Sequence, residues 1–165
     1  MSEHVPRFGR DESDEERLDR QLLELLNAVR VAIPGVQVLF AFLLTVPFAA
    51  RWGDTTELQQ NVYFATLLLT ASASALLMAP AAIHRLRFRM GDKRAIVEWG
   101  HRFTIAGLAV LGVAMAGAVF LVTDVLYEVT SAAIAAGAVL GLIVGLWFVL
   151  PLSRRFYHRG EGPPT

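Results

Sequence analysis

The chain has 165 residues, of which 55% are hydrophobic and 18% charged, and its 15 basic residues balance its 15 acidic residues. A soluble domain of this size usually carries about a quarter charged residues, so this composition argues against a soluble protein. Cysteine is absent, which excludes disulfides, thiolate metal sites and a cysteine nucleophile.

The N-terminal region divides into two segments before the first long apolar block. Residues 1–12 are polar, charged and without periodicity, which predicts a disordered tail. Residues 13–30 carry leucines at helical spacing opposite a charged face, with Ser13 and Glu16 as a capping box. We expect an amphipathic cytoplasmic helix here, either lying on the membrane surface or acting as a docking or oligomerisation surface.

Four apolar blocks follow, each of about 20 residues or more and each free of charged residues and histidine. They are residues 31–50, 62–83, 103–123 and 129–152. A helix of about 20 residues spans the roughly 30 Å hydrocarbon core, and only helices satisfy their own backbone in lipid. The sequence therefore predicts an all-α membrane protein, with four transmembrane helices forming a bundle over residues 31–153.

Prolines and capping pairs set the expected limits of the helices. Pro34 and Pro47 are expected to bend the first helix, and Pro80 to bend or end the second. Asp54 with Glu57 resembles a capping pair, which would start the second helix near Thr55. In the connection 84–102, Gly91-Asp92 is typical of a turn between two short amphipathic stretches.

Basic residues predict the orientation. Of the 15 Lys and Arg residues, 14 lie in the N-terminal segment, the middle connection and the tail 154–165, and Arg51 alone lies in the other two connections. The positive-inside rule then places both termini in the cytoplasm. We expect a multi-pass protein of the bacterial inner membrane, ending in a basic, flexible tail.

Polar side chains within the spans are candidates for a functional path. They are Gln37 on the first helix and Tyr63, Thr66, Thr70 and Ser74, spaced three, four and four, on the second. One interpretation is a hydrated path or small-solute site between the two helices. The other, which we favour, is structural: the hydroxyls bond their own helix and Gln37 ties helices together.

Small residues predict close helix packing. Gly137, Gly141 and Gly145 form a double GxxxG motif on the fourth helix, and Gly107, Gly112 and Gly117 recur on the third. Such spacing lets two helix backbones approach closely. The motif alone leaves open whether the partner helix belongs to the same chain, and we favour packing within the chain.

The sequence shows no set of residues typical of catalysis. Glu98 and His101 form one Glu-x-x-His unit, whereas a di-iron bundle needs two with further carboxylates. Asp124 and Glu128 lie at the end of a span and are interpreted as solvated acids. We therefore expect no enzyme, no catalytic residue, no metal, no cofactor and no nucleic-acid partner.

Several stretches resemble a family of small bacterial four-helix membrane proteins that is catalogued as a domain of unknown function. The resemblance covers about residues 20–155 and is carried by the run from Arg30 to Thr45, by 62–69, and by Ala79-Pro with His84-Arg85 and Phe88-Arg89. It implies the four-helix architecture. Some members are labelled sodium:proton antiporters, although no span of this chain contains the carboxylate expected for proton coupling.

Two functional hypotheses follow. In the first, the chain is a non-catalytic scaffold or modulator of a membrane partner. In the second, it is a small oligomeric ion channel or transporter, similar to a cation/proton antiporter. The candidate partners are the lipid bilayer, a second copy of the chain and another membrane protein.

Overall fold

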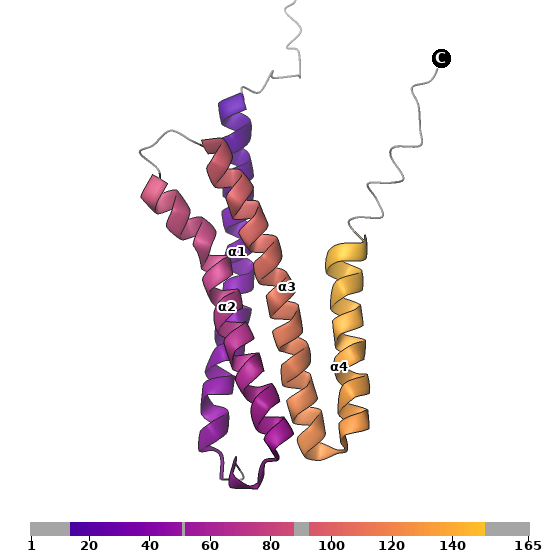
Figure 1. Cartoon of the computed structure of the whole chain (residues 1–165). Helices are drawn as coiled ribbons and strands as arrows, with labels where there is room; N and C mark the ends of the chain where they lie inside the picture. The colour runs from indigo at the N-terminus through magenta and orange to yellow at the C-terminus, as the bar shows by residue number, and fades with distance from the viewer. Residues whose placement is uncertain (1–13, 51, 88–92, 151–165) are drawn as a thin grey trace, which may run out of the picture.

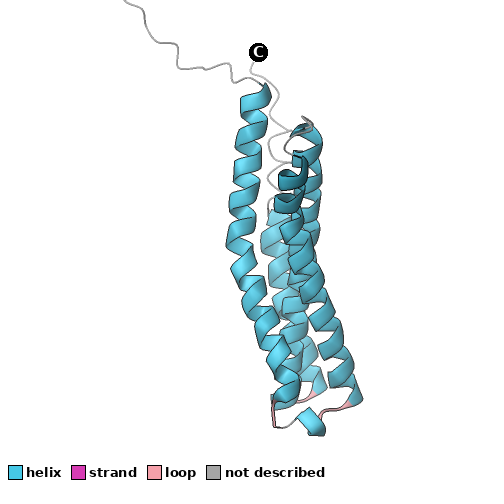
Figure 2. Cartoon of the chain, turned by 90° about the vertical axis from the view of Figure 1, so that its left-hand side faces the viewer, coloured by secondary structure: helices cyan, strands magenta, loops and turns pink. Residues whose placement is uncertain are grey.

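The computed structural model describes residues 14–50, 52–87 and 93–150, and within these ranges the chain is helical, with short turns and no strand (Figures 1 and 2). The main elements are α1 (Asp14–Thr45), α2 (Glu57–Arg87), α3 (Lys93–Leu126) and α4 (Val129–Val144). Two 3-10 turns, η1 (Val46–Phe48) and η2 (Trp52–Asp54), join α1 to α2, and a π-helical turn, η3 (Gly145–Val149), continues α4. The predicted tails 1–12 and 154–165, the cap at Ser13 and the Gly91-Asp92 turn lie outside the described residues.

All four helices are long and apolar enough to cross a membrane, which confirms the predicted all-α membrane bundle. The helices are longer than the predicted spans. α1 joins the predicted amphipathic segment 13–30 to the first span without a break, and α3 begins ten residues before its span. Hydropathy locates only the lipid-facing part of a helix, whereas backbone hydrogen bonds continue past the headgroups into water.

The start of α2 is capped by a different pair from the predicted Asp54 and Glu57. The Thr56 backbone N–H donates to Gln59 Oε1 at 3.0 Å, and the Gln59 N–H donates to Thr56 Oγ1 at 3.2 Å. This reciprocal pair is a capping box that satisfies two of the free N–H groups at the helix start. The cap fixes the first residue of α2 at Glu57.

Pro80 bends α2 rather than ending it, because the helix continues to Arg87. Its ring is buried against α3, beside Gly100. In Figure 1 the last turns of α2 lean away from α1 and α3. Proline is tolerated inside a membrane helix when neighbouring helices pack around the kink.

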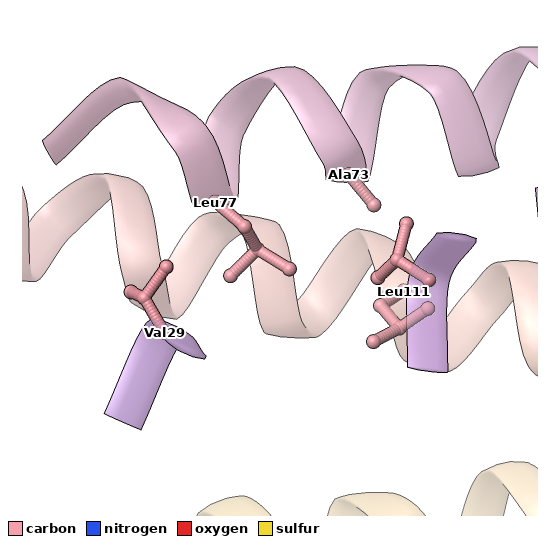
Figure 3. Close-up of a cluster of buried hydrophobic side chains, with 5 residues drawn as sticks. Val29, Ala73, Leu77 and Leu111 are labelled. Atoms are coloured by element: carbon pink, nitrogen blue, oxygen red, sulfur yellow. The ribbon is translucent and has the colours of Figure 1, made fainter. Parts of the chain in front are cut away.

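The core lies along the seam between α1, α2 and α3. The buried positions of α2 alternate in spacing between three and four; they are Tyr63, Thr66, Thr70, Ala73, Leu77 and Pro80. This is the spacing of a left-handed coiled-coil seam. Ala73 and Leu77 meet Leu111 of α3 and Val29 of α1 in the central cluster (Figure 3).

Helix α4 packs against α3 and, among the described elements, makes no contact with α1 or α2. Figure 1 shows α4 standing beside α3 with its far side uncovered. The contact is close where Ile143 of α4 lies over Gly112 of α3. The bundle is therefore a three-helix core with a fourth helix attached to one side.

Candidate functional site

Four of the five predicted path residues lie on one face of α2, toward the core. Thr66 and Thr70 are buried, and Ser74 is partly buried at the edge of the seam. Thr66 Oγ1 donates to the Val62 carbonyl at 2.7 Å, and Thr70 Oγ1 donates to that of Thr66 at 2.8 Å. Ser74 Oγ donates to the Thr70 carbonyl at 3.0 Å. Each of the three hydroxyls therefore donates its proton to a backbone carbonyl of α2. The row presents few free polar groups to a solute.

Tyr63, at the end of the row, holds α2 to α1. Its hydroxyl donates to the Leu43 carbonyl at 3.0 Å, and its ring meets Trp52 edge-on at a centroid distance of 4.9 Å. The Leu43 carbonyl is available because the residue four positions later is Pro47, which has no N–H to donate. Tyr63 therefore supplies the hydrogen bond that the proline removes.

Opposite the hydroxyl row, α3 presents small residues. A methyl group added at Gly117 would collide with the Thr66 side chain, and one added at Gly107 would lie 2.8 Å from Leu77 Cγ. On the same side, the buried Thr104 donates to the Gly100 carbonyl at 2.9 Å. The close helix approach within this chain therefore lies between α2 and α3. In the sequence, this approach corresponds to the glycines of the third apolar block. Their spacing is less typical of helix packing than the GxxxG motif of the fourth block.

Gln37 does not join the hydroxyl row. Its side chain is exposed on the outside of α1, and within the described part of the chain no hydrogen bond to it is found. Thr70, by contrast, is fully buried between helices. The two residues therefore do not face a common internal cavity.

The glycines of the predicted packing motif on α4 also lie away from the core. A methyl group added at Gly137, Gly141 or Gly145 would have no heavy atom within 4 Å. Helix α4 instead meets α3 through other residues, among them the buried Ala132 and Ile143. Within the described chain the motif is thus an open surface and not a helix crossing, in contrast to the packing within the chain that we favoured from the sequence.

A separate apolar groove, which none of these three glycines lines, lies between α1, α3 and α4. It has a volume of about 710 Å³ and is lined on α1 by residues such as Gly35 and Leu39, on α3 by Leu108 and Met115, and next to α4 by Trp147. The groove exists because α1 and α4 both contact α3 but not each other. Trp147 belongs to the π-helical turn η3, a local irregularity that often marks functional sites.

A second cavity, of about 380 Å³, lies between the end of α1, the connection that follows it, the start of α2 and the end of α3. Its walls are mostly apolar, and its polar groups include Asp124 and Gln59, whose Nε2 donates to Asp124 Oδ2 at 2.8 Å. Trp52 and Tyr63 also line it. Sequence reasoning treated Asp124 as a solvated helix end and did not bring it together with Gln59, which lies 65 positions away.

The Glu-x-x-His unit shows ordinary surface chemistry. Glu98 Oε1 accepts from Arg102 at 2.9 Å, both side chains are largely exposed, and His101 is exposed one turn away. A search of the described residues finds no group of three His, Cys, Asp or Glu side chains that could hold a metal ion.

Comparison with known proteins gives a family but no activity. The model of a family described as "Family of unknown function (DUF6328)" matches residues 11–151, so the chain belongs to this family. No curated protein and no solved structure matches the chain. The resemblance stated from the sequence is thereby confirmed, and the function has to be argued from the geometry.

Proposed function

We propose that this member of a family of unknown function is a non-catalytic scaffold or modulator that binds a transmembrane helix of another membrane protein. We place it in the bacterial inner membrane with both termini in the cytoplasm, as the distribution of basic residues indicates. The observation that carries the proposal is the open side of α4, where the glycine row faces none of the residues that the structure describes on other helices.

The chemistry of this surface suits a second helix. Lipid tails are as apolar as leucine, so membrane helices associate through close packing and interhelical hydrogen bonds. Gly137, Gly141 and Gly145 offer a flat track for a backbone on the exposed side of α4. A partner helix seated there would contact α4 on the side turned away from Ile143 and α3.

Transport has weaker support from the same geometry. The hydroxyls of Thr66, Thr70 and Ser74 are bonded within α2, and these residues line neither the groove nor the cavity at the short connections. Gln37, the remaining polar side chain of the predicted path, lies on the outer surface. The arrangement therefore favours a packing role for the hydroxyl row.

The test compares two exposed positions on α4. The full chain would be extracted from native membranes, and the abundance of any stoichiometric complex would be compared between Gly141→Ile and the control Leu142→Ile. We expect Gly141→Ile to lose the complex, since a branched side chain blocks a close backbone approach, while Leu142→Ile retains it. Equal retention by both variants would contradict the proposal.

Ion flux in proteoliposomes tests the opposing hypothesis directly. Purified protein would be challenged separately with proton, sodium and potassium gradients, beside a Gln37→Leu/Thr70→Val double variant. We expect no flux above empty liposomes for either protein. Flux that the double variant loses would establish a transport path and refute the scaffold.

A further inference from the structure

Gln37 is an uncharged polar side chain on an apolar helix surface. It lies eleven residues before Phe48, which places it about 16 Å from that end of a hydrocarbon core about 30 Å thick. It is therefore close to the middle of the membrane. Ala41 and Leu44, four and seven residues later on the same face of α1, are apolar and exposed.

An amide at this depth needs a hydrogen-bonding partner. Gln37 carries two donors and two acceptor lone pairs on its side chain, and the described part of the chain supplies it with no bond. Lipid tails have no polar atom, and the hydrocarbon core holds no water to replace one. Polar groups left unpaired in such surroundings are costly, and in membrane proteins they are paired across helices.

We propose that Gln37 is the centre of a self-association surface, in which two copies of the chain pack α1 against α1 and exchange hydrogen bonds between their Gln37 amides. An amide is its own complement: across a two-fold axis each side chain donates an N–H to the carbonyl oxygen of the other. In two copies of the chain, the Gln37 side chains lie at the same depth in the membrane, and each provides the hydrogen-bonding partner of the other.

The surroundings of Gln37 suit this arrangement. Leu44 lies seven residues later, two helical turns along the same face, and is exposed. Phe48, in the turn η1 that follows α1, is 88% exposed. Gln37 and Leu44 do not line the groove, and the open glycine surface lies on α4, so the inference goes beyond the proposed scaffold and does not depend on it.

The absence of cysteine makes a direct test available, because any introduced cysteine is the only one in the chain. Leu44→Cys keeps Gln37 and reports on the proposed face. Val38→Cys is the matched control, since it is at least as exposed but turned about 100° around the helix from Gln37. Oxidation in native membranes should yield a covalent dimer for Leu44→Cys and little for Val38→Cys.

The role of the amide is tested by adding Gln37→Met, which preserves the length of the side chain and removes its hydrogen bonds. We expect the dissociation constant in detergent to rise about 5- to 30-fold and the Leu44→Cys cross-link to fall accordingly. Because the Gln37 side chain is exposed and forms no hydrogen bond within the described chain, thermal unfolding of the separated monomer should be unchanged, which distinguishes lost association from lost folding.

Three results would overturn the proposal: no cross-link at Leu44→Cys, a cross-link that Gln37→Met does not weaken, or equal cross-linking at Val38→Cys. The same oxidation applied to Gly141→Cys distinguishes this surface from the one on α4. A Gly141→Cys homodimer that is insensitive to Gln37→Met, with no dimer from Leu44→Cys, would place self-association on α4 and refute a Gln37 interface.

Discussion

Thr66 lies closer to Gly117 than any side chain lies to the other described glycines. The threonine hydroxyl donates back to its own helix, and its oxygen is the atom nearest to the position that a side chain on Gly117 would occupy. A row of hydroxyls in a membrane span is therefore compatible with a dry, closely packed seam. A polar side chain whose hydrogen bonds are made within its own helix can pack in a core, whereas one with free hydrogen-bonding groups can line a hydrated path.

The first prediction compares the same substitution at two helical glycines. Gly117→Ala should lower the free energy of unfolding by about 1–3 kcal/mol, because the new methyl displaces Thr66 from its hydrogen-bonded position. Gly141→Ala meets open space and should be neutral or stabilise by up to about 1 kcal/mol, since alanine favours a helix. Thermal unfolding in detergent measures both, and equal effects would contradict the assignment of the close crossing to α2 and α3.

The second prediction concerns the hydrogen bond from Tyr63 to the Leu43 carbonyl. Tyr63→Phe should cost about 1 kcal/mol of unfolding free energy, because the carbonyl loses its donor. In a Pro47→Ala background the cost should be smaller, since the new backbone N–H can serve the same carbonyl. A double-mutant cycle measures this coupling, and additive effects would show that Tyr63 does not replace the bond missing at Pro47.

The helices differ in how many neighbouring helices they contact, and α4 has fewer neighbours than α2 or α3. α3 contacts the other three helices, and α2 contacts both α1 and α3. α4 depends on α3 alone. A substitution on the α4 side of α3 should therefore move one helix without opening the core, as expected for a helix that leaves one side available to a partner.

The third prediction follows from this difference. Gly112→Val should shift α4 away from α3, because even the first added carbon would lie 2.9 Å from Ile143 Cγ2. Spin labels on introduced cysteines at Val113 and Leu142 should report a longer or broader distance distribution. Labels at Val113 and Leu68, which is on α2, should report no change. A change in both pairs would mean that α4 is part of the core.

The whole molecule has two chemically different ends. The connections 46–56 and 127–128 lie at one end of the bundle, and the ends of α2 and α4 and the starts of α1 and α3 lie at the other (Figure 1). Four consecutive helices that cross a membrane in alternating directions have their connections at the two ends in turn. Described basic residues such as Arg20, Arg87 and Lys93 lie toward the second end.

The fourth prediction is the orientation. Reporter fusions should place both termini and the connection around residues 88–92 in the cytoplasm, because 14 of the 15 basic residues flank that side. Adding several lysines beside Asp124 should impair insertion or alter the fusion pattern. A chain that inserts identically with those lysines would contradict the charge argument.

The sequence by itself determined the number of spans, the helical class and the absence of charged residues and histidine within them, because these depend only on local hydropathy and on the need of each backbone to bond itself in lipid. It also located the hydroxyl row on one helix face, since helical spacing is a local property. The tertiary structure decided which faces meet. Gly107 and Gly117 of α3 face α2 while the glycines of α4 remain open, and Gln37 faces outward, because the choice among similar apolar faces depends on the shapes of side chains from distant segments. The pairing of Gln59 with Asp124 was decided in the same way, since only the fold brings the two residues together.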